Sequence, residues 1–276
     1  GDNRLVVLIL RGGMDGLDVV RPMGDPAFAS LRPGLQDGDP AHDLDGYFAL
    51  HPALGDLVPL WDKGELGFVH SVSTPYRDKR SHFDGQDLLE AGTVALSGGV
   101  RDGWLNRMLQ EVPGLEADTA YAIGTGDLRV LEGAAPVANW APEANLRISP
   151  AALRLASLVM EPDAPMHAAL AEAEILSQTA GASGRGGRAH QQIARFAAER
   201  LREDARVAAF SLNGWDTHRA QARNLGRSLT TLSETVTLLR DGLGAQAWDK
   251  TALVAMTEFG RTARENGTGG TDHGTG

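Results

Sequence analysis

Acidic side chains and histidines gather in short segments that directly follow apolar runs of this sequence. Gly214-Trp215-Asp216-Thr217-His218 follows one run, Thr257-Glu258-Phe259-Gly260-Arg261 follows another, and Thr271-Asp272-His273-Gly274 comes soon after. Carboxylates and imidazoles are the ligands that zinc and similar ions use in proteins. The candidate metal ligands in these segments are Asp216, His218, Glu258, Asp272 and His273.

Asp15 is a sixth candidate, in the turn Arg11-Gly12-Gly13-Met14-Asp15-Gly16 after the first apolar run. Each segment also has a plainer interpretation. Asp-Gly is a common turn pair, Asp216 could cap the next helix, and the Asp272-His273 segment could be a polar loop. Four such segments at strand ends favour a shared site over coincidence.

A basic segment from Ser73 to Asp84 provides a different chemistry. Ser81 stands at the start of a predicted helix, where free N–H groups and the helix dipole favour anions. A serine in that position could attack a phosphate or sulfate ester if a metal lowers the pKa of its hydroxyl. Arg77 and Arg80 could bind the non-bridging oxygens of such an ester. The alternative for Ser81 is a simple N-cap.

Apolar runs and helical periodicity indicate the elements that would position these residues. A helix over 222–243 has Leu225, Leu229, Leu232, Val236, Leu239 and Leu243 on one face, and it links two predicted strands. The alternation predicts an α/β domain with a doubly wound, mostly parallel sheet and helices on both faces. Strands are predicted over 5–10, 66–72, 120–124, 207–212 and 251–256, helices also over 83–91, 152–160, 166–178 and 191–203, and a flexible loop over 181–187.

Composition excludes several classes of protein. The chain has 276 residues, enough for one domain spanning 1–276, and a formal net charge of -10 that disfavours nucleic acid as a partner. It has no cysteine, so a thiolate metal site is impossible, and no apolar run long enough to span a membrane. The start at Gly1 suggests a removed export signal, and the glycine-rich end suggests that natural sequence continues beyond Gly276. The oligomeric state is left open.

Together these segments resemble the alkaline phosphatase-like superfamily of phosphatases and sulfatases, and in particular an exported bacterial family of unknown function. The resemblance runs from near the start of the chain to its end. The segments that carry it are Leu10-Arg11-Gly12-Gly13-Met14-Asp15-Gly16, Arg80-Ser81-His82-Phe83-Asp84, Gly214-Trp215-Asp216-Thr217-His218, Glu258-Phe259-Gly260-Arg261-Thr262 and Gly270-Thr271-Asp272-His273-Gly274.

The resemblance implies an alkaline phosphatase/sulfatase-like fold with two metal ions. Asp15 would bind one ion, Asp216 and His218 the other, with Asp272, His273 and Glu258 as further ligands, and Ser81 would be the nucleophile. The ions would be divalent: zinc first, with manganese, magnesium or calcium as alternatives. The substrate would be a small anionic ester, and the location periplasmic or secreted.

The sequence departs from the superfamily pattern in three places. Asp216 and His218 are two residues apart where many relatives space the pair by four, and Asp272-His273 lies in a later loop than usual. The last histidine ligand of the family would lie beyond Gly276. Ser73-Thr74-Pro75-Tyr76-Arg77 also echoes the sulfatase signature, which makes Ser73 a rival nucleophile.

Two functions follow. The first is a metal-dependent hydrolase of phosphate or sulfate esters with a serine nucleophile. The alternative is a non-catalytic exported protein that retains the fold and a structural metal. A phosphomutase-like transferase is disfavoured, because no segment is long enough for a second, substrate-shuttling domain.

Overall fold

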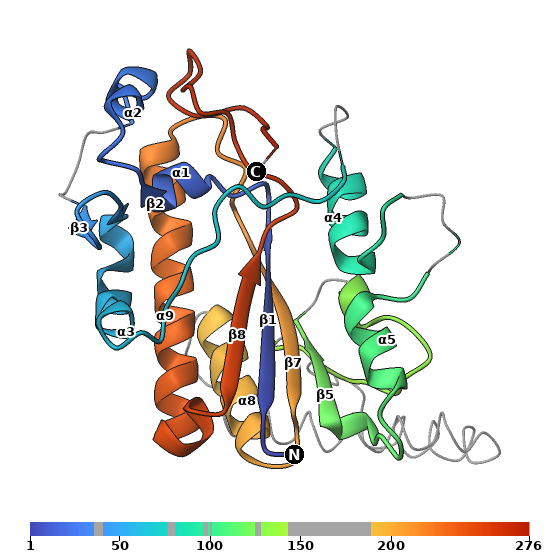
Figure 1. Cartoon of the computed structure of the whole chain (residues 1–276). Coiled ribbons are helices and arrows are strands. Elements are labelled where there is room, and N and C mark those ends of the chain that lie inside the picture. The colour runs from blue at the N-terminus through green and yellow to red at the C-terminus, as the bar shows by residue number, and fades with distance from the viewer. Residues whose placement is uncertain are drawn as a thin grey trace, which may run out of the picture.

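A five-stranded parallel sheet organises the chain, in a computed structural model that describes residues 1–35, 41–76, 81–95, 99, 101–124, 128–142 and 189–275. The strand order is β6-β5-β7-β1-β8, and every neighbouring pair is parallel. The strands are β1 (Arg4–Arg11), β5 (Ala120–Ile123), β6 (Ala138–Trp140), β7 (Val207–Asn213) and β8 (Thr251–Met256). In Figure 1 the labelled strands β1, β5, β7 and β8 all run upward, so their carboxyl ends face the same edge of the sheet. The predicted α/β class with a mostly parallel sheet is confirmed.

The central strand β1 explains why both faces of the sheet are covered. Successive side chains of a strand point to opposite faces. Val6 and Leu8 join one apolar cluster, whereas Val7 and Ile9 join another, and all four are fully buried. A strand buried on both faces needs a continuous apolar run, which is what residues 5–10 contain.

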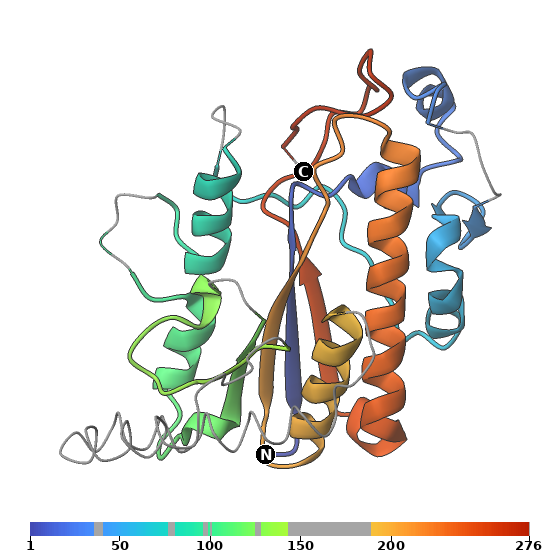
Figure 2. The same cartoon turned by 180° about the vertical axis from the view of Figure 1, so that it is seen from behind.

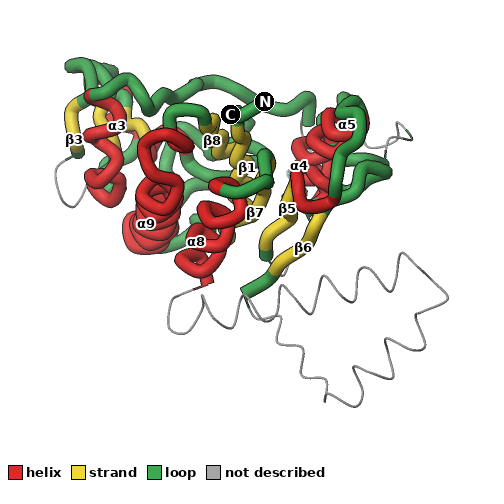
Figure 3. Tube along the Cα trace, turned by 90° about the horizontal axis from the view of Figure 1, so that it is seen from below, coloured by secondary structure: helices red, strands yellow, loops and turns green. Residues whose placement is uncertain are grey.

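Two long helices cover one face and two shorter helices cover the other (Figures 2 and 3). On the first face lie α8 (Ala189–Arg202) and α9 (Gln221–Trp248). The second face carries α4 (His82–Ala91) and α5 (Trp104–Gln110). The predicted helices over 83–91, 191–203 and 222–243 are confirmed. The predicted stripe of α9 is buried along its length, and α9 carries the chain from β7 across β1 to β8.

Short elements link the main layers. A small antiparallel sheet contains β2 (Val20–Arg21), β3 (His42–Asp43) and β4 (Ala49–Leu50) in the order β2-β4-β3. Other short helices among the described residues are α1 (Gly16–Val19), α2 (Pro26–Leu31), η1 (Pro52–Leu57), α3 (Val58–Asp62), η2 (Ala117–Thr119) and η3 (Arg129–Leu131).

The prediction of a strand over 66–72 is wrong. This segment makes no strand pairing, although β8 is an edge strand of the sheet. Leu66 and Phe68 pack against the core, but Val69 is 84% exposed and Val72 62% exposed. The run therefore crosses the surface between α3 and α4 as a loop.

Some predictions fall on other parts of the chain. Arg77, Arg80, the helices over 152–160 and 166–178, and the loop over 181–187 lie outside the described residues. Within the described ranges, no helix combines the length and the apolar character that crossing a membrane requires.

Candidate metal centre

Loops that follow β1, β7 and β8 meet at the carboxyl edge of the sheet, beside the first turn of α4. Asp216 and His218 follow β7, Asp272 and His273 follow β8, and His82 opens α4. The loops after β7 and β8 lie together at the top of Figure 1. The parallel sheet thus gathers side chains that are nearly 200 residues apart in the sequence.

Three polar groups from the β7 and β8 loops are in mutual contact. His218 Nε2 lies 2.9 Å from His273 Nε2 and 3.1 Å from Asp216 Oδ1. The distance from His273 Nε2 to Asp216 Oδ1 is 3.4 Å. Four ligands around a tetrahedral zinc ion, at metal–ligand distances near 2.0–2.1 Å, would lie about 3.3 Å from one another. The observed spacings suit ligands of one ion.

His82, from α4, completes this set of side chains, although it was not among the ligands predicted from the sequence. We call His82, Asp216, His218 and His273 the metal group. His82 Nε2 lies 3.4 Å from Asp216 Oδ2, and the His82 ring meets the His273 ring edge-on at 4.4 Å between centroids. His82 Nε2 is buried and has no hydrogen-bond partner among the described residues. One ligand atom each from His82, Asp216 and His273 lies within 4.8 Å of the others, so this triad could hold a metal ion.

Glu258 orients His82 from behind. Its carboxylate is fully buried, and Oε1 lies 2.8 Å from His82 Nδ1 while accepting hydrogen bonds from Gly12 N and Gln86 Nε2. Burial raises the pKa of Glu258, but hydrogen bonds from its own amide, Gln86, His82 and Thr257 outweigh burial and leave the pKa below its usual value. An ionised carboxylate only accepts, so His82 Nδ1 carries a proton, and in the neutral ring Nε2 presents a lone pair.

Asp272 orients His218, as Glu258 orients His82. His218 Nδ1 lies 3.0 Å from Asp272 Oδ1, and this hydrogen bond is the main reason that the pKa of Asp272 is lowered. His218 therefore also directs the lone pair of Nε2 into the group. Metal-binding histidines are commonly held by a carboxylate on the other ring nitrogen. Glu258 and Asp272 thus fit positioning roles, rather than the ligand roles that the resemblance implied.

We expect Glu258→Gln to weaken metal binding by about 10- to 100-fold, the usual consequence of losing an outer-shell partner. The amide no longer fixes the proton on His82 Nδ1, although it keeps the volume of the side chain. Competition with a chromogenic zinc chelator measures the affinity. Glu116→Gln is the matched control, because Glu116 lies in a distant loop before η2. Unchanged affinity in Glu258→Gln would contradict the positioning role.

Arg261 holds the three loops together. Its side chain is fully buried and donates hydrogen bonds to the carbonyl oxygens of Gly12, Gly13 and Thr271, and to Asp216 Oδ1. Burial raises the pKa of Asp216, but the hydrogen bond and charge of Arg261 outweigh it, so the pKa lies below its usual value. Asp216 is therefore ionised when the site is assembled.

The close approach of the β1 and β7 loops requires glycine at position 12. Gly12 has φ +131°, and a Cβ there would lie 2.5 Å from Asp216 N. We expect Gly12→Ala to displace the Asp216 backbone and to lower the free energy of unfolding by about 1 to 3 kcal/mol, measured by urea denaturation. Gly16→Ala, at the start of α1 directly after the loop, is the control, because a Cβ at Gly16 meets no atom within 4 Å. Equal stability of the two variants would contradict the steric argument.

Asp15 lies in a separate buried network. Arg32 binds both of its carboxylate oxygens, with Nη1–Oδ2 at 2.6 Å and Nη2–Oδ1 at 3.0 Å, and Gln221 donates to Oδ2. Burial raises the pKa of Asp15 above its usual value, although Arg32 acts in the opposite direction. The carboxylate is neutralised by a guanidinium, and no contact joins it to the histidines.

Gln221 connects the Asp15–Arg32 network to the loops that carry the metal group, because its Nε2 contacts Asp15 and its Oε1 contacts these loops. Oε1 of Gln221 accepts hydrogen bonds from Thr217 Oγ1 at 3.0 Å and from Thr271 Oγ1 at 2.6 Å. Both threonines are fully buried, and they directly precede His218 and Asp272 in the sequence. Asp15 therefore supports the loops that carry the site.

Ser81 is the N-cap of α4. Its Oγ accepts a long hydrogen bond of 3.5 Å from Asp84 N, and its own N–H donates to Tyr76 Oη at 2.8 Å. The capping interpretation is thus confirmed, and a nucleophilic role stays a prediction. Ser73, the rival serine, lies half-buried in the loop before α4.

Sequence reasoning missed two residues of the site. His82 lies beside Ser81 in a segment that was already recognised, but nothing local shows that its ring turns toward the β7 loop. Arg261 ends the Glu258 segment and could have been noticed as a lone cation among acids. Only the assembled loops reveal what either side chain contacts.

Comparison with known proteins assigns the chain to a family. Searches of curated proteins and of solved structures each found no match. Residues 70–276 match the family described as "Protein of unknown function (DUF1501)". All members of the metal group lie inside the matched region, whereas Asp15 precedes it. Since the matched region covers about three quarters of the chain, the chain belongs to the DUF1501 family.

Proposed function

We propose that this protein is a metal-dependent hydrolase of phosphate or sulfate esters, with an alkaline phosphatase/sulfatase-like fold. One observation carries the proposal: Nε2 of His82, His218 and His273 converge on the carboxylate of Asp216. The tautomers that Glu258 and Asp272 impose direct lone pairs of His82 and His218 toward an ionised carboxylate. Arg261 already places one positive charge beside Asp216 Oδ1, and a metal ion would be held by the Nε2 lone pairs together with the carboxylate.

The donor set selects the metal. Three imidazoles and one carboxylate match zinc or a similar transition metal, whereas magnesium and calcium prefer sites made wholly of oxygen. Zinc is therefore the first choice, manganese the second. When bound, the ion supplies Lewis-acid polarisation of an ester oxygen and lowers the pKa of an attacking hydroxyl.

Side chains of the first turn of α4 face the same edge of the sheet. His82 belongs to the metal group, and Ser81 directly precedes it at the N-terminus of a ten-residue helix. The free N–H groups of that turn and the helix dipole favour an anion beside the Ser81 hydroxyl. Ser81 is the proposed nucleophile. The resemblance of the sequence to the alkaline phosphatase-like superfamily and its exported bacterial members supports a periplasmic or secreted location, which we include in the proposal.

Hydrolysis of aryl phosphates and aryl sulfates in the presence of zinc, manganese, magnesium or calcium tests the proposal. We expect Ser81→Asn to lower kcat by at least about 1,000-fold, because Asn lacks a nucleophilic hydroxyl. Asn is as good an N-cap as Ser, so the helix is preserved and circular dichroism should be unchanged. Ser73→Asn is the matched control. Full turnover in Ser81→Asn would eliminate Ser81, and loss in Ser73→Asn alone would transfer the role to Ser73.

A second candidate is a non-catalytic protein with a structural metal. The observation that favours it is the Asp15–Arg32 ion pair, which occupies the acid that the resemblance assigned to another metal ion. The same assay decides between the two. Stoichiometric zinc and a raised melting temperature, without turnover of any ester tested, would support the structural role.

A further inference from the structure

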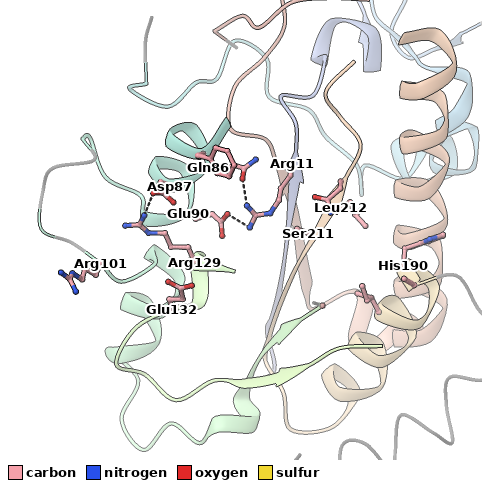
Figure 4. A pocket seen from close by; sticks show the side chains of 15 residues that line it. Arg11, Gln86, Asp87, Glu90, Arg101, Arg129, Glu132, His190, Ser211 and Leu212 are labelled. Atoms are coloured by element: carbon pink, nitrogen blue, oxygen red, sulfur yellow. Dashed lines mark hydrogen bonds and ion pairs between the residues drawn. The ribbon is translucent and has the colours of Figure 1, made fainter. Parts of the chain in front are cut away.

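A crevice of about 950 Å³ opens at the carboxyl edge of the sheet, on the β5 side of the metal group (Figure 4). Its floor contains the ends of three strands, with Arg11 from β1, Gly124 after β5 and Asn213 from β7. Side chains of α4 line one wall and the start of α8 lines another. This volume suits a ligand the size of a mono- or disaccharide.

The strand order explains why a crevice forms there. β5 and β7 are neighbours, but the chain leaves β5 toward β6 and leaves β7 toward β8, in opposite directions. The first connection carries η3 on one face of the sheet, and the second carries α9 on the other. Open α/β sheets bind ligands where neighbouring connections diverge in this way. The topology and the cavity therefore indicate the same place independently.

Charges of opposite sign balance along the lining. Arg11 pairs with Glu90 at 2.7 Å, and Arg129 pairs with Asp87 at 2.8 Å. Figure 4 shows both pairs, with Asp87 and Glu90 on α4, Arg129 on η3 and Arg11 at the end of β1. Arg101 and Glu132, both exposed, add one further charge of each sign. An anion would meet the exposed Asp87 and Glu132, a cation would meet three guanidinium groups, and an apolar ligand would cover the exposed Arg101 and Glu132 and remove them from water.

Hydroxyl groups suit this lining, because a hydroxyl donates to a carboxylate and accepts from a guanidinium at the same time. Neighbouring hydroxyls of a sugar or polyol could bridge an Arg–carboxylate pair without disturbing its charge balance. Phe83, which also lines the crevice, is 83% exposed, and its ring offers an apolar surface for the C–H face of a sugar. The lining thus combines planar polar groups with one exposed aromatic ring.

The crevice adjoins the residues that support the metal group. Gln86 accepts a hydrogen bond from Arg11 Nη1 at 2.7 Å and donates to Glu258 Oε1 at 3.1 Å. Phe83 directly follows His82 on α4. A ligand in the crevice would therefore lie beside Gln86 and Phe83, next to the residues that hold His82.

We propose that the crevice binds a neutral, polyhydroxylated group, that is, a sugar or a polyol. The identity of the substrate rests on the proposed function: the neutral group is then the organic part of the ester, and the substrates are sugar or polyol phosphates or sulfates. Binding of the neutral group itself does not depend on hydrolysis.

The test is direct binding of neutral sugars and polyols to the full chain, by saturation-transfer NMR and calorimetry. The probes are glucose, galactose, mannose, fucose, xylose, myo-inositol and their disaccharides, with inorganic phosphate and sulfate as anionic probes. A chelator is present, so that anions have no metal to bind. We expect at least one neutral probe to bind, and the double variant Arg101→Ala/Glu132→Ala and the single variant Phe83→Ala each to weaken that probe at least tenfold. Arg223→Ala/Glu111→Ala, which removes exposed charges elsewhere, is the matched control.

Different results separate this inference from the proposed function. Asp216→Ala should abolish ester hydrolysis but leave sugar binding intact. If no neutral probe binds, if binding survives the crevice variants, or if phosphate binds the crevice more tightly than any sugar, the inference is wrong whatever the hydrolase assay shows. If sugars bind as expected but no ester is hydrolysed, the crevice assignment stands and only the hydrolase proposal falls.

Discussion

Replacing Asp216 by alanine should abolish stoichiometric metal binding, with a loss of affinity of more than about 100-fold. Asp216 is the only carboxylate that contacts all three histidines of the described group, through Oδ1 to His218 and His273 and Oδ2 to His82. Without it, three imidazoles face one another with no anionic ligand. Elemental analysis after dialysis and competition with a zinc chelator measure the effect.

The matched control for this variant is Asp241→Ala. Asp241 lies on α9, is 61% exposed and pairs only with the neighbouring Arg240 among the described residues. It should bind metal as the wild type does. Equal zinc content in the Asp216 and Asp241 variants would eliminate the proposed centre, and the hydrolase proposal with it.

The second large effect concerns stability. We expect Arg32→Met to lower the free energy of unfolding by about 3 to 5 kcal/mol, measured by urea denaturation in the presence of a chelator. Arg32 is 1% exposed, binds both oxygens of Asp15 and donates to two carbonyl oxygens of the β8 loop, at Thr262 and Ala263. The variant leaves a buried carboxylate without its partner. Arg240→Met, at an exposed pair, should change stability by less than about 1 kcal/mol.

The pH dependence of this variant provides an independent check. Burial already raises the pKa of Asp15, and removing Arg32 raises it further. A carboxyl whose pKa is higher in the folded state gains stability as the pH falls. The deficit of Arg32→Met should therefore shrink as the pH falls from 7 toward 5, and Asp15→Asn/Arg32→Met should lose that trend. A deficit independent of pH would show that Asp15 is not the group responsible.

Most regular elements could be predicted from the sequence. The runs at 5–10 and 207–212 are strands because an uninterrupted apolar run suits a strand covered on both faces, and the run at 251–256 pairs with β1 as a more exposed edge strand. The periodic stripe of α9 likewise specifies a helix with one buried face. The run at 66–72 has similar residues, but whether a run joins a sheet depends on where the folded chain places it relative to a strand edge, which no local pattern reveals.

The grouping of the site followed from the same logic, up to a point. Asp216, His218, Asp272 and His273 were expected together because parallel strands present their carboxyl ends at one edge, and the structure brings them together. The partners of each acid were not predictable. Glu258 faces His82 and Asp15 faces Arg32, and these pairings span 176 and 17 residues of sequence.

By itself the sequence determined the α/β class, the central strands, the covering helices and the segments that carry acids and histidines. Those features follow from periodicity and residue type, which act over a few neighbouring positions. Only the tertiary structure decided that His82 joins the metal group, that Glu258 orients it and that Asp15 is neutralised by Arg32. A carboxylate has the same local signature whether it meets a metal, a histidine or a guanidinium, because its role depends on what the folded chain brings within about 3 Å of it.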